Sequence, residues 1–68
     1  MTDKIKIAVD AMGGDNSPKK VIDGIIHHHQ NNKNVFYKIF GDITDVVKCI
    51  NNKINVNNFE IVNIIKII

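Results

Sequence analysis

The chain has 68 residues, of which 44% are hydrophobic and 24% are charged, and its formal net charge is +2. This length allows one domain at most, a single cysteine excludes an internal disulfide framework, and no apolar run approaches the roughly 20 residues needed to cross a bilayer. The nine basic residues are scattered lysines without any arginine, so we expect a cytoplasmic protein without a nucleic-acid partner and with at most a peripheral membrane association.

The N-terminal part of the chain predicts a strand, a loop and a helix. Residues 4–10 alternate between apolar and polar positions, which is typical of a strand. Residues 11–17 are rich in glycine, aspartate and asparagine, which favour turns. Ser17 and Pro18 suit the N-cap and the first position of a helix, and apolar residues at helical spacing follow over residues 21–26.

The second half repeats this arrangement. Residues 35–40 are almost continuously apolar, as in a strand that is covered on both faces. Asp42 can cap a second helix, because apolar residues recur at i, i+3, i+4 and i+7 over residues 43–50. Residues 59–62 predict a third strand.

Three consecutive histidines, residues 27–29, lie at the end of the first predicted helix. Adjacent helical residues point about 100° apart, so these three imidazoles cannot converge on one metal ion. We expect a solvated helix end there and no metal site in the chain.

The order strand, helix, strand, helix, strand favours a parallel α/β sheet. Two successive crossovers in one winding direction cover one face of a sheet, whereas a parallel sheet needs helices on both. We therefore predict a partial Rossmann-like parallel sheet, with residues 1–68 forming a single N-terminal portion truncated from a larger α/β/α domain.

The loop from Asp10 to Ser17 is the candidate site, because ligands of open parallel sheets bind beyond the carboxyl ends of the strands. Its glycines permit close backbone approach, and N–H groups near residues 18–20 lie at the positive end of a helix dipole, where an oxyanion or phosphate can bind. Asp10 and Asp15 oppose a fully ionised phosphate, so we expect them to accept protons or hydrogen bonds, or to hold the loop's own amides. The alternative is a glycine turn capped by Ser17.

The most specific motif is the run IAVDAMGGD, residues 7–15, followed by Ser17 and Pro18. It resembles the N-terminal signature of the bacterial phosphate acyltransferases of the PlsX family. The resemblance continues more weakly over residues 21–26, 40–42 and 59–63.

This resemblance implies an α/β/α Rossmann-like fold and a reaction without a cofactor. Inorganic phosphate would attack the thioester of an acyl-acyl-carrier protein, giving acyl phosphate for phospholipid biosynthesis. Five residues are carried over by resemblance as lining of the active site, and Asn16 and Ser17 of the same loop are taken with them as substrate-binding candidates; the five are Asp10, Met12, Gly13, Gly14 and Asp15. The catalytic roles of Asp10 and Asp15 stay unassigned.

The chain departs from the family pattern after Asn63, and the later motifs that complete the family's site have no counterpart in these 68 residues. We therefore expect a fragment that is inactive alone, with a homodimer partner or a separate C-terminal portion as its possible companions. Two alternatives stay open: a non-catalytic module that binds phosphate or a partner, and a non-functional gene remnant.

Overall fold

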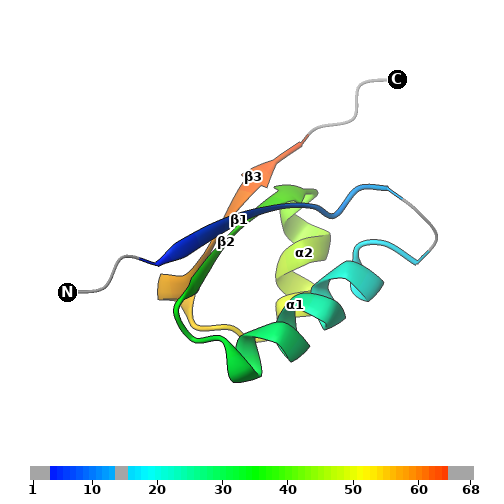
Figure 1. Ribbon diagram of the computed structural model, residues 1–68. Coiled ribbons are helices and arrows are strands. Elements are labelled where there is room, and N and C mark those ends of the chain that lie inside the picture. The colour runs from blue at the N-terminus through cyan, green and yellow to red at the C-terminus, as the bar shows by residue number, and fades with distance from the viewer. Residues whose placement is uncertain (1–3, 14–15, 65–68) are drawn as a thin grey trace, which may run out of the picture.

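The computed structural model describes residues 4–13 and 16–64, and this part of the chain alternates strands and helices as predicted. The strands are β1 (Ile5–Asp10), β2 (Val35–Gly41) and β3 (Phe59–Asn63), and the helices are α1 (Lys19–Asn31) and α2 (Ile43–Ile50), with a short 3-10 turn at Val56–Asn58. The strands form one parallel sheet in the order β1-β2-β3, which confirms the partial Rossmann-like α/β arrangement (Figure 1). None of the helices in the described residues is long and apolar enough to cross a membrane.

Both helices lie on the same side of the sheet, so its two faces have different environments (Figure 1). Along β2, Tyr37 and Ile39 are buried on the helix-bearing face, whereas Lys38 between them is exposed. The prediction that this strand is covered on both faces is therefore wrong for the described chain. Covering the second face needs a further element, and residues 4–13 and 16–64 place both of their helices on the first.

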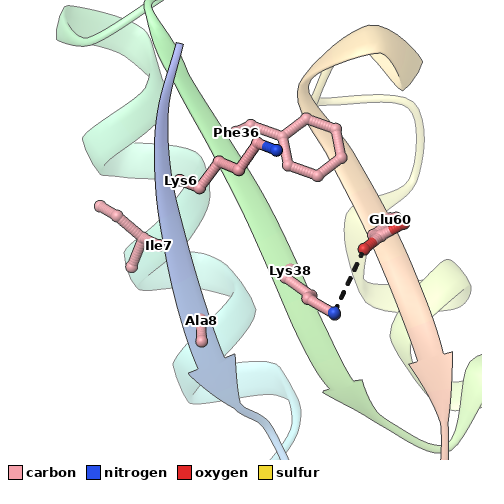
Figure 2. Close-up of a pocket in the computed structure, with 6 residues that line it drawn as sticks. All are labelled: Lys6, Ile7, Ala8, Phe36, Lys38 and Glu60. Atoms are coloured by element: carbon pink, nitrogen blue, oxygen red, sulfur yellow. Dashed lines mark ion pairs between the residues drawn. The ribbon is translucent and has the colours of Figure 1, made fainter.

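The open face of the sheet carries charged side chains beside the ring of Phe36 (Figure 2). Lys6, Phe36 and Lys38 line a broad hollow of about 420 Å³ together with Glu60. The Nζ atom of Lys38 is 3.9 Å from a carboxylate oxygen of Glu60 and 5.8 Å from the centre of the Phe40 ring. These cations shield part of the apolar surface from water.

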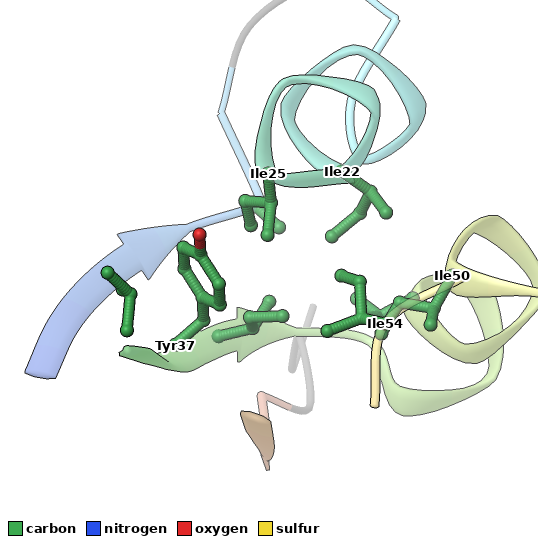
Figure 3. Packing of buried hydrophobic residues seen from close by; sticks show 9 residues of the cluster. Ile22, Ile25, Tyr37, Ile50 and Ile54 are labelled. Carbon is green, nitrogen blue, oxygen red and sulfur yellow. The ribbon is translucent and has the colours of Figure 1, made fainter. Parts of the chain in front are cut away.

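The core lies between the helices and the covered face (Figure 3). Ile22 and Ile25 point from α1 toward Tyr37 of β2, and Ile50 and Ile54 close the core on the side of α2. Ile22 is fully buried and Tyr37 is 2% exposed. Each such side chain contributes about 1.5–3 kcal/mol of burial free energy, so these few contacts hold α1 onto the sheet.

The histidines at the end of α1 are more closely packed than predicted. His29 is 4% exposed, and its Nδ1 atom has no hydrogen-bond partner among the described residues. The Nδ1 atom of His28 lies 2.6 Å from the Tyr37 hydroxyl, and both imidazoles meet that ring edge to face. The solvated helix end is therefore wrong for His29, which is buried against Tyr37, whereas His28 contacts the same ring but stays exposed as predicted.

Burial also shifts the proton affinities in this cluster. Desolvation lowers the pKa of His29, and the nearby positive charge of Lys33 lowers it further. Desolvation raises the pKa of Tyr37. Both groups therefore favour their uncharged forms in the folded chain.

Candidate functional site

The carboxyl ends of the three strands meet at one edge of the sheet, as predicted for the candidate site (Figure 1). A hollow of about 240 Å³ lies there, between the loop after β1 and the start of α2. Its lining consists of Ala11, Met12, Ser17, Pro18, Asp42, Asp45 and Ile64. The larger hollow on the open face lies over the middle of the strands and is separate from this edge.

The loop after β1 is anchored by its first two residues. The Ala11 N–H donates to the carbonyl of Phe40 at 2.8 Å, which extends the pairing with β2 by one residue, and Ala11 is 3% exposed. The Met12 N–H donates to Oδ1 of Asp10 at 2.8 Å. Asp10 therefore holds a loop amide, which was one of the roles considered for it, and this amide is not available to a ligand.

The start of α1 differs from the predicted cap. Pro18 occupies the N-cap position and provides no side-chain hydrogen bond, whereas the Ser17 hydroxyl donates to the carbonyl of Gly13. The prediction of Ser17 as N-cap and Pro18 as first helical residue is therefore wrong. The turn that precedes the helix begins one residue earlier, because Asn16 adopts a positive φ of 64° and its carbonyl accepts the Lys20 N–H at 3.0 Å.

This geometry lowers the number of free N–H groups that could bind an anion at the start of α1. The Lys20 amide is already bonded to Asn16, and Pro18 has no N–H. In the same turn, Lys19 directs its ammonium group to Asp23, with 2.6 Å between Nζ and Oδ2, and this hydrogen bond raises the pKa of Lys19. The first turn of α1 therefore offers an anion fewer donors than the sequence suggested.

The start of α2 is tightly capped by two side chains. Asp42 is the N-cap, as predicted, and its carboxylate accepts the Asp45 N–H at 3.2 Å. The Asn63 side chain accepts the Ile43 N–H at 3.0 Å, and the Ile64 N–H donates to the carbonyl of Gly41 at 3.0 Å. The end of β3 is thus tied directly to the junction between β2 and α2.

The predicted site residues are only partly brought together. Met12 and Ser17 line the hollow, and Asp10 lies next to it and is exposed. Gly13 and Asn16 belong to the same loop but are not among the lining residues. Two further predicted residues, Gly14 and Asp15, lie outside the described residues.

Sequence reasoning overlooked Asp42, Asp45 and Ile64 as lining residues. The available signal was their position, since each lies close after a predicted strand and the carboxyl ends of parallel strands share one edge. Asp42 was considered only as a cap. Among the described residues, no group of three or more histidine, cysteine, aspartate or glutamate side chains could hold a metal ion.

Comparison with known proteins gives a consistent assignment. A family model described as a fatty acid synthesis protein matches residues 5–68. The chain belongs to this family. Its curated relatives include proteins named phosphate acyltransferase, which confirms the resemblance seen in the sequence.

One phosphate acyltransferase, from Pelagibacter ubique, is 57% identical over 63 residues that cover 93% of this chain and 19% of that protein. The protein of the same name from Neorickettsia sennetsu is 35% identical over 63 residues, covering 91% of this chain and 18% of its own length. The one from Limosilactobacillus fermentum is 37% identical over 62 residues, with the same two shares. The chain therefore spans about a fifth of the length of these curated relatives.

Proposed function

We propose that this chain forms one wall of an active site in which inorganic phosphate takes the acyl group of an acyl-acyl-carrier protein. The observation that carries this proposal is the 57% identity, over 93% of the chain, to a protein named phosphate acyltransferase. The hollow where the three strands end supports it, because this edge of a parallel sheet is where substrates of such folds bind.

The proposed reaction balances without a cofactor. An oxygen of hydrogen phosphate attacks the thioester carbonyl, and the tetrahedral intermediate expels the thiolate of the carrier. The proton of the hydrogen phosphate passes to that thiolate, which leaves acyl phosphate and the free thiol of the carrier protein. The enzyme has to align phosphate with the carbonyl and stabilise the oxyanion that develops on it.

The loop after β1 is proposed to provide part of this alignment. Asp10 fixes the Met12 amide, and the Ser17 hydroxyl bonds to Gly13, so both ends of the loop are held by its own side chains. We assign substrate contact to this loop, including Asn16. The same assignment extends to Gly14 and Asp15 on the resemblance alone.

The remaining expectations belong to the same proposal. The protein acts in the cytoplasm in lipid synthesis, and it works with the polypeptide that corresponds to the other four-fifths of its relatives or as a homodimer. The loop favours the arrangement with a second polypeptide. The N–H groups of Met12 and Lys20 are already hydrogen-bonded within the chain, so the described loop by itself offers few donors for phosphate.

A chimera tests the proposal directly. The 68-residue chain would replace the matching segment of the Pelagibacter protein, and acyl phosphate formed from acyl-acyl-carrier protein and inorganic phosphate would be trapped as a hydroxamate. We expect activity comparable to that of the intact Pelagibacter protein. A chimera that folds and associates like the parent but forms no acyl phosphate would contradict the proposal.

An Asp10→Ala variant of this chimera sharpens the test. Losing the bond to the Met12 amide should lower kcat/KM while the thermal midpoint changes little, because Asp10 is exposed. Glu60→Ala is the matched control, since it removes a charged and exposed side chain from the open face of the sheet, away from the hollow. Equal losses in both variants would argue against a role for the loop.

A further inference from the structure

The hollow at the carboxyl edge is unsuited to the phosphate that the proposed reaction uses. Four of its seven lining residues are apolar, one is a serine, and the remaining two are the carboxylates Asp42 and Asp45. Among the described residues, neither a lysine nor a histidine lines this hollow. A phosphate dianion in this hollow would meet two negative charges without a compensating cation from the described lining.

The backbone at this point does not offset that repulsion. A helix N-terminus can hold an anion through its free amides, but at α2 the Ile43 N–H is bonded to Asn63 and the Asp45 N–H to Asp42. The Met12 N–H on the opposite wall is bonded to Asp10. Three amides at or next to the hollow are thus already hydrogen-bonded to side chains of this chain, so they are not available to an anion.

The apolar side of the hollow fits an uncharged group. Met12 is 39% exposed and Ile64 is 38% exposed, and both line the hollow together with the half-buried Pro18. The volume of about 240 Å³ is below the 300–1,000 Å³ typical of pockets that hold a whole ligand, so only part of a substrate fits. A thioester and the methylene groups beside it are uncharged and weakly polar.

We infer that this hollow holds the methylene groups next to the thioester, with the thioester carbonyl at its mouth where phosphate can reach it, and that Asp42 and Asp45 exclude inorganic phosphate from the hollow itself. This inference rests on the proposed function and deepens it, because it assigns the two substrates to different places. The hollow takes the neutral part of the donor, and phosphate approaches the carbonyl from outside the hollow. Asp45 is then a specificity-determining residue, since it lines the hollow with a charged side chain while its amide is held by Asp42.

The test follows backbone amide signals of the 68-residue chain by NMR during two separate titrations. The probes are S-hexanoyl-N-acetylcysteamine, a small neutral thioester, and inorganic phosphate. We expect the thioester to shift the signals of Met12, Asp45 and Ile64, and phosphate to leave these three unchanged. Phosphate shifts at these amides, or their silence in the thioester titration, would overturn the inference.

Charge variants make the second half of the test specific. Asp45→Lys should allow phosphate to shift the amides around the hollow, whereas the control Glu60→Lys changes the net charge equally on the open face of the sheet and should not. Asp45→Asn provides a milder change if the lysine variant does not fold. Identical phosphate responses of these amides in the Asp45 and Glu60 variants would show that only the net charge of the chain matters, and would overturn the role of Asp45.

The two proposals can fail separately. A chimera that forms acyl phosphate, combined with a thioester that does not shift the hollow, would reject the assignment of the hollow and keep the proposed function. Thioester shifts at the hollow in a chain whose chimera forms no acyl phosphate would reject the proposed function alone.

Discussion

The two junctions between a strand and the following helix are built in opposite ways. Between β2 and α2 only Asp42 intervenes, and its side chain caps the helix while Asn63 from β3 bonds to the next amide. Between β1 and α1 a loop of residues 11–18 intervenes, and the helix begins without a side-chain cap. The short junction is hydrogen-bonded to the end of β3, whereas the side-chain hydrogen bonds described for the long junction lie within the loop itself.

This difference separates stability from function within one edge of the sheet. A capped, one-residue junction positions α2 against the core and leaves its first amides occupied. A long loop without a helix cap contributes less to stability and tolerates changes more readily, which is the usual property of binding loops. We therefore expect mutations at the second junction to affect mainly folding, and mutations at the first to affect mainly ligand binding.

The largest effect is expected at Gly41, in the short junction. A Cβ atom there would lie 3.1 Å from Cγ2 of Val46 and 3.4 Å from Cβ of Ala11, so Gly41→Ala should lower the free energy of unfolding by about 1–3 kcal/mol. Gly24→Ala on α1 is the matched control, because no atom lies within 4 Å of its added Cβ. That change should stabilise the helix by about 0.5–1 kcal/mol. Urea unfolding measures both, and equal signs would contradict the packing described at Gly41.

The caps of the two helices provide the next comparison. Asp42→Ala removes the acceptor of the Asp45 amide and should cost about 1 kcal/mol in the free energy of unfolding. Ser17→Ala should stay within about 0.5 kcal/mol, because Ser17 does not cap α1 and lies at the surface of the loop. Thermal unfolding of both variants measures the two stability losses. A larger loss in the serine variant would show that Ser17 caps α1 after all, as the sequence predicts.

Asn63 tests the tie between β3 and the short junction. Asn63→Ala frees the Ile43 amide, and we expect a loss of about 0.5–1.5 kcal/mol, toward the lower end because water can reach this amide. Asn57→Ala is a suitable control, since Asn57 is equally exposed and lies in the 3-10 turn before β3. If urea midpoints of the two variants coincide, the bond from Asn63 contributes no stability.

The smallest effect at neutral pH is expected at the other end of α1, where His29 is buried. Its folded pKa lies below the ordinary value of about 6.5, so the unfolded chain binds a proton more readily. Stability should therefore be complete above pH 6.5 and should fall as the pH drops through that value toward the folded pKa.

Unfolding free energies at pH 7.5 and 5.5 measure this dependence. His29→Gln should flatten it, whereas His27→Gln, which changes an exposed histidine of the same helix, should leave it in place. An unchanged pH dependence in the His29 variant would show that other groups cause it. The result also indicates how firmly the last turn of α1 is packed in comparison with its uncapped start.

Much of the fold was accessible from local patterns. The apolar repeat over residues 43–50 and the cap at Asp42 located α2 exactly as the structure has it, because both depend only on neighbouring residues. The strand over residues 35–40 was also found, but its burial on both faces was inferred from a continuous apolar run. Phe36 and Phe40 are only half-buried, because which face a helix covers is a property of the whole arrangement.

The candidate site was accessible in part for the same reason. The motif over residues 7–15 indicated the family and its loop, and Met12 and Ser17 do line the hollow. The sequence could not show that Asp45 and Ile64 face the same hollow, since they come from segments about 30 to 50 positions further along the chain. It also could not show that the Met12 and Lys20 amides are already bonded.

The sequence by itself therefore determined the order of elements, the parallel sheet, the family and the loop that carries its motif. These follow from short-range periodicity, capping and turn chemistry, which act over a few residues. Only the tertiary structure decided which face of the sheet is covered, that His29 is buried against Tyr37, and that Asp42 and Asp45 at the start of α2 border the loop after β1. Those outcomes depend on contacts between segments far apart in the chain, and local residue preferences contain no information about the distance between such segments.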